Sequence, residues 1–158
     1  VGGGISEADN WRITANTNVN TDGFVTANWE RNDSSGYASI GTGLSESSGV
    51  FSFATTGFYL ITYHAAFIIH GGDVQCVLAL NTTLNNSDFN QVCHAIAGQE
   101  STTDGVRGSA SSSFIFDVTN TTNCKFKFNT ESMSTSTGLV GNTNHSFTNF
   151  TVVRLGDT

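Results

Sequence analysis

Four histidines, His64, His70, His94 and His145, are the side chains best suited to proton transfer or metal binding near neutral pH. Serine and aspartate are plentiful, so a Ser–His–Asp triad is easy to assemble on paper. The chain has no Gly-x-Ser-x-Gly sequence, the strained turn that exposes the nucleophile of many hydrolases. The residue types therefore favour no nucleophilic site.

Metal and cofactor sites are not expected either. His64 and His70 would share one strand face but lie about 20 Å apart, too far to hold one ion. The turns at Asn32-Asp33 and at Asp73 lack EF-hand spacing and are interpreted as solvated turns. The glycine-rich loops that bind nucleotides are absent from the sequence.

A hydrolase on a β scaffold is the least favoured hypothesis. It needs converging carboxylates, and the only candidates in the polar loops are Glu100, Asp104 and Glu131. We therefore expect a protein that is not an enzyme.

The charge distribution excludes two classes of partner. Six basic residues against thirteen acidic ones give a net charge of −7, and neither sign is clustered. Binding to a nucleic-acid backbone would lack its electrostatic contribution, and an anionic membrane would repel the chain. We expect neither nucleic acid nor membrane as a partner.

The cysteines Cys76, Cys93 and Cys124 are odd in number and widely spaced, which does not suggest a zinc site. Each lies in an apolar stretch, so we interpret them as buried free thiols. One disulfide with a leftover thiol is the alternative.

The elements that would position these residues are β-strands. Charged residues make up only 12% of the chain, and Ser, Thr, Asn and Gly must supply the polar surface, which favours strands and turns over helices. Alternating or apolar runs between turn clusters predict eight to ten antiparallel strands in a sandwich, jelly roll or barrel, with polar loops at 99–108 and 131–144. The predicted strands are 10–13, 24–30, 37–44, 49–53, 58–69, 74–80, 89–97, 113–118, 124–129 and 147–155.

One domain is expected over residues 9–158, after a flexible lead-in over residues 1–8. The chain begins Val1-Gly2-Gly3-Gly4 without methionine, which suggests a fragment or a processed form.

The run 58–69 is apolar at both odd and even positions. It contains Phe58, Tyr59, Tyr63 and Phe67 among β-branched residues, which is typical of a strand covered on both faces. One face would fill the monomer core and the other would meet a neighbouring subunit.

Residues 49–61 resemble the central motif of the C1q/TNF-like superfamily, G-x-F-x-x-P-x-x-G-x-Y-x-F. Phe51, Gly57 and Tyr59 stand at matching positions, whereas Ala54 replaces the usual proline. Asn28-Trp29, Ile40-Gly41 and the ending 146–155 resemble other strands of that family. The resemblance implies a jelly-roll sandwich that forms a compact homotrimer, with Phe58, Tyr59, Tyr63 and Phe67 at the trimer interface.

A narrower resemblance links the chain to virion proteins of marine tailed bacteriophages. It rests on residues 8–13, on 40–43 with 46–49, and on the ending 154–158. It implies a capsid decoration or fibre protein on the virion surface, with the major capsid or tail protein of the same particle as partner. The alternative is a receptor- or glycan-binding C1q-like recognition module.

Overall fold

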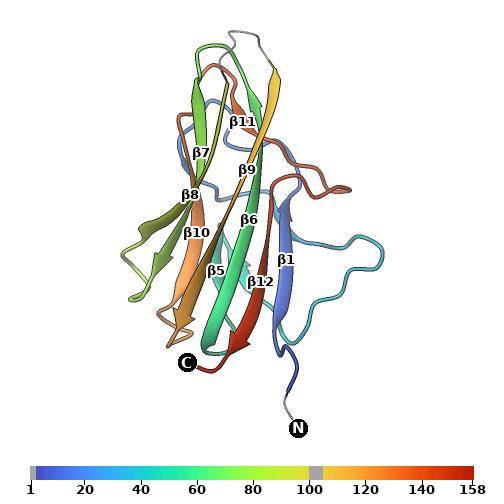
Figure 1. Ribbon diagram of the computed structural model, residues 1–158, viewed down its shortest axis with the longest axis vertical. Coiled ribbons are helices and arrows are strands. Elements are labelled where there is room, and N and C mark those ends of the chain that lie inside the picture. The colour runs from blue at the N-terminus through green and yellow to red at the C-terminus, as the bar shows by residue number, and fades with distance from the viewer. Residues whose placement is uncertain (1–2, 100–104) are drawn as a thin grey trace.

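A computed structural model describes residues 3–99 and 105–158, and these residues form two packed antiparallel sheets (Figure 1). The described residues contain no helix, and thus none long and apolar enough to cross a membrane. This is the all-β sandwich that composition and strand spacing predicted.

Sheet A has β6 near its centre, with β9 as one edge strand and β12 on the other side. The first and last strands of the chain pair in this sheet, with Ala8 opposite Val153. Across the sheet the strands are β9 (Val106–Val118), β6 (Gly57–Ile69), β12 (Asn149–Gly156) with the short β11 (Gly138–Leu139), β1 (Ala8–Ile13) and β3 (Trp29–Arg31).

Sheet B packs against sheet A and ends at β8 on the side where sheet A ends at β9. Its strands, in spatial order, are β4 (Ser45–Ser47), β5 (Val50–Ser52), β10 (Lys125–Glu131), β7 (Gln75–Thr83) and β8 (Asn90–Gly98), and β2 (Gly23–Phe24) pairs with β10.

Aromatic rings fill the centre of the core between the sheets. Phe51 is fully buried at its centre, and its ring centroid lies 4.7 Å from that of Phe150 and 5.1 Å from that of Phe126. Trp11 and Trp29 meet Phe51 edge to face. Because each ring buries a large area, a few of them fill a thin two-layer core despite the modest apolar content.

Three predicted strands differ from the structure. The segment 24–30 is split, because Phe24 pairs in sheet B and Trp29 pairs in sheet A. The chain crosses between the sheets at Asn28, whose φ is 66°. The predicted strand 37–44 is reduced to one bridge at Ile40, and β9 begins at Val106, seven residues before the predicted Ser113.

Candidate interaction surfaces

The four residues predicted to form a trimer interface do not share a face. Tyr59, Tyr63 and Phe67 point into the core and are 1–2% exposed, whereas Phe58 points outward and is 38% exposed. The burial pattern alternates along all of β6. The expectation for Tyr59, Tyr63 and Phe67 is therefore corrected: these rings face sheet B, and only the even-numbered residues of β6 can meet a neighbour.

An apolar row crosses the outer face of sheet A. Leu60 lies opposite Ile115 on β9 and opposite Val153 on β12. Val153 lies opposite Ala8, which bridges to Ile40. Ile115 is 58% exposed and Ile40 is 45% exposed. We call these five residues the apolar row.

Beyond this row the outer face of sheet A is rich in hydroxyl groups. The register places Thr62 opposite Ser113, and His64 opposite Ser111. His64 Nδ1 lies 2.7 Å from Ser111 Oγ. This pair has a base and a hydroxyl, but His64 makes no hydrogen bond to a carboxylate within residues 3–99 and 105–158, so the orienting group of a triad is not supplied.

A groove of about 720 Å³ follows the edge where β8 and β9 approach each other. Its floor is apolar, with Val92, Phe114 and Phe116, and Ile115 belongs to both the groove and the apolar row. The rim carries the carboxylates of Asp88 and Asp117. The groove and the row therefore form one surface that turns around the β9 edge.

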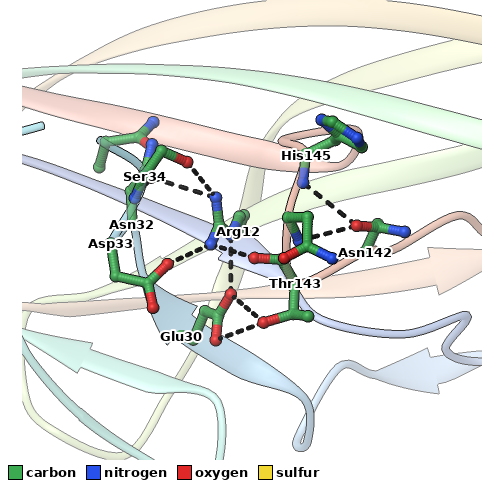
Figure 2. Close-up of polar contacts among 10 residues, drawn as sticks. Arg12, Glu30, Asn32, Asp33, Ser34, Asn142, Thr143 and His145 are labelled. Carbon is green, nitrogen blue, oxygen red and sulfur yellow. Dashed lines mark hydrogen bonds and ion pairs between the residues drawn. The ribbon is translucent and has the colours of Figure 1, made fainter. Parts of the chain in front are cut away.

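Figure 2 shows a polar cluster around the buried Arg12 of β1. Arg12 Nε donates to Glu30 Oε1 at 2.7 Å, and Nη1 donates to Asn32 and Ser34. Nη2 donates to Asp33 and to the carbonyl of Thr143. All donors of the guanidinium are used, so Arg12 joins the loops and has no donor left for a ligand.

A second buried charge, Asp9, ties β1 to the chain after β3. Its carboxylate accepts hydrogen bonds from Arg31, Trp11 and the hydroxyl of Tyr37. Burial, and then the hydrogen bond to Asp9, raises the pKa of Tyr37 to about 12. Because a tyrosine that donates to a carboxylate stays protonated, this contact is structural and does not prepare a base.

Within the described residues, the remaining candidates for chemistry are not brought together. Glu100 and Asp104 lie outside the described residues, and Glu131 lies on the outer face of sheet B. The described part of the chain contains no group of three or more His, Cys, Asp or Glu side chains that could hold a metal ion. His64 and His94 lie on different sheets.

All three cysteines are free in the structure. Cys76 and Cys124 are buried, and Cys93 is half-buried. Burial, with a smaller contribution from the charge of Asp73, raises the pKa of the Cys76 thiol to about 12. Since only the thiolate is a nucleophile, Cys76 is inert at neutral pH.

The outer face of sheet B carries a polar ladder formed by five side chains. Asn129 Oδ1 accepts hydrogen bonds from Asn81 Nδ2 at 2.6 Å and from Gln91 Nε2 at 3.2 Å. Gln91 also donates to Glu131, and its Oε1 lies 2.9 Å from His94 Nε2. The ladder crosses β10, β7 and β8.

Beside the ladder, the ammonium of Lys127 lies between two aromatic rings. Its Nζ is 3.5 Å from the ring centroid of Phe24 and 4.0 Å from that of Phe89. Burial lowers the pKa of Lys127. Cation–π attraction holds the charged group in place.

Solved structures give the class of fold. The chain is similar to murine APRIL, with a TM-score of 0.64 and 13% identity over 94% of this chain and 98% of that one. It is also similar to Eiger TNF from S. frugiperda, with a TM-score of 0.67 and 13% identity over 96% and 93% of the two chains. No family model and no curated protein matches the sequence. The chain thus has the TNF-like jelly-roll fold, as the motif at 49–61 predicted.

Ile115, Val153, Ala8 and Ile40 of the apolar row were not among the residues predicted for an interface. Ile115 and Val153 lie at outward-facing positions of their strands, where polar residues are expected. An apolar residue at such a position was the available signal. The Lys127 site had no such signal, because Phe24 and Phe89 are distant from it in sequence.

Proposed function

We propose that this protein is a non-enzymatic homotrimer that serves as a structural component on the surface of a tailed-phage particle, as a capsid decoration or fibre protein. The apolar row on the outer face of sheet A carries the trimer proposal. Soluble monomers rarely expose a large contiguous apolar patch, and such patches mark interaction sites. Covering the row with a second copy removes apolar area from water.

The shape of this surface favours a ring. The groove lies at the sheet edge and the row lies on the sheet face, so one copy can place its β8–β9 edge over the row of the next. Such a head-to-tail contact closes into a ring when the rotation fits. The resemblance of residues 49–61 to the C1q/TNF-like motif implies a ring of three.

Light scattering of the purified chain tests the trimer. We expect a mass three times the 16.7 kDa of one chain. Ile115→Lys should give monomers, because the contact would bury an unpaired charge. Val74→Lys is the matched control, since Val74 is 75% exposed and lies outside the row and the groove.

Two results would contradict the trimer proposal. A wild-type chain that stays monomeric at all concentrations rejects the trimer itself. A trimer that persists in Ile115→Lys removes the apolar row from the interface.

The virion role rests on the resemblance of residues 8–13, of 40–43 with 46–49, and of 154–158 to phage virion proteins. Quantitative mass spectrometry of purified particles should find the chain at a fixed copy number relative to the major capsid protein. Its absence from the particles would reject this role and leave the trimer untouched.

The second candidate function is a receptor- or glycan-binding recognition module. It is favoured by two features of sheet B, the polar ladder and Lys127, whose ammonium lies between two aromatic rings. These groups lie on the face opposite the apolar row, so they stay accessible when sheet A is covered.

A further inference from the structure

We infer that the outer face of sheet B binds a neutral, hydroxyl-rich oligosaccharide along β10, between Lys127 and Glu131. The inference rests on the second candidate function, recognition, and is independent of the trimer. Sugar hydroxyl groups both donate and accept hydrogen bonds, so a site for an oligosaccharide needs fixed donors and acceptors along its length.

Lys127 supplies the donors. Its ammonium is held between the rings of Phe24 and Phe89 and makes no hydrogen bond or ion pair within residues 3–99 and 105–158. The N–H groups that do not face the two rings are therefore available to a ligand, on a side chain whose position is already fixed. Because the side chain is ordered before binding, little entropy is lost when a ligand arrives.

Glu131 supplies an acceptor at the other end. Its Oε1 accepts hydrogen bonds from Gln91 and Asn129, which orient the carboxylate, while the contacts of the described residues leave Oε2 without a hydrogen bond. Lys127 and Glu131 are four residues apart on one face of β10, or about 13 Å by strand rise. The amide of Asn129 lies between them, so the site is extended along the strand.

Other occupants fit this face less well. A protein partner needs an apolar interface core, and the exposed large apolar side chains on this face are, within the described residues, Phe24 at 43% and Ile96 at 53%. A nucleic acid would be repelled by a chain of net charge −7. Phe24 can instead pack against the C–H face of a sugar ring, which leaves a neutral oligosaccharide as the ligand that the chemistry favours.

A printed array of neutral glucan, mannan and galactan oligosaccharides tests this inference, followed by calorimetry with the strongest binder. We expect saturable binding by the wild-type chain. Lys127→Met and Glu131→Gln should each weaken it roughly tenfold, since each loses a hydrogen bond to a charged group. Lys125→Met is the control, because Lys125 lies two residues along the same face of β10 without a clamp of aromatic rings.

Absence of binding to every oligosaccharide on the array overturns the inference. It is also overturned if both variants bind as the wild type does, or if Lys125→Met weakens binding equally. Melting curves confirm that each variant is folded. Because the two variants lie at opposite ends of the site, one of them still tests the inference if the other does not fold. Light scattering of the same samples separates the proposals: a trimer without glycan binding rejects only this inference, and a monomer that binds rejects only the trimer.

Discussion

The side chain of Arg12 is completely buried, yet all five of its N–H donors find acceptors. They join Glu30 of β3 to the loop at 32–34 and to the carbonyl of Thr143 (Figure 2). A planar guanidinium can bridge segments in this way, whereas the ammonium of lysine has only three donors. At the residue scale, loop positions on sheet A thus depend on one buried charge.

Replacing Arg12 with methionine should lower the free energy of unfolding by on the order of 3 kcal/mol, since the acceptors lose a buried charged partner. Urea unfolding measures this loss. Arg107→Met is the control, because Arg107 is an exposed residue of β9, and it should change stability by less than about 0.5 kcal/mol. Equal stability of the two variants would contradict the structural role of Arg12.

The carboxyl of Asp73 makes the free energy of unfolding depend on pH. Burial opposes its ionisation, but hydrogen bonds from Ser134 and Thr137 outweigh burial and lower the pKa of the carboxyl. A carboxyl whose pKa is lowered by folding stabilises the protein above its unfolded pKa, near 4, and loses this contribution as pH falls through the folded pKa.

We therefore expect Asp73→Asn to melt at a lower temperature than the wild type at pH 7. Its melting temperature should also fall less between about pH 5 and pH 2, because the titrating group is gone. Calorimetry over this range measures both effects. Parallel curves for the two proteins would show that Asp73 does not contribute to acid sensitivity.

At the scale of elements, the hairpin of β4 and β5 depends on Gly49. Its φ is 80°, and a Cβ there would lie 2.1 Å from the carbonyl oxygen of Val25. Gly36 has a φ of 90° but no atom within 4 Å of such a Cβ. Both glycines have a left-handed backbone that would strain an alanine, but only at Gly49 would the added Cβ also clash with another atom.

Gly49→Ala should therefore destabilise the protein more than Gly36→Ala does. Each alanine costs about 1–2 kcal/mol for the backbone conformation, and only Gly49→Ala adds the displacement of the segment at Val25. Chemical denaturation of the pair measures the difference. Similar losses would mean that the hairpin moves away from Val25 at little cost.

At the scale of the whole molecule, folding requires pairing of distant segments, because β1 pairs with β12 and β6 with β9. Such topologies fold in milliseconds to seconds. The chain contains no proline, so a refolding phase of tens of seconds cannot arise from prolyl isomerisation. We expect any slow phase to accelerate with protein concentration, as trimer assembly would. Stopped-flow refolding at several concentrations measures this, and a slow phase independent of concentration would argue against assembly.

The all-β class, most strand positions and the motif at 49–61 could be predicted from the sequence, because these depend on local periodicity, turn residues and spacing. The sequence also predicted free thiols and the absence of helices from composition. Tyr59, Tyr63 and Phe67 were predicted on a subunit surface, because a run with apolar side chains at both odd and even positions does not by itself reveal which set faces the core.

Packing of the two sheets decides which set faces the core, since sheet B covers the odd-numbered face of β6 and leaves Leu60 half-buried on the outer face. It also decided which distant residues meet. Leu60 joins Ile115 and Val153 through strand register, and Lys127 joins Phe24 and Phe89 through pairing of β2 with β10 and the path into β8. Register and crossing between sheets depend on long-range packing, which no local pattern in the chain encodes.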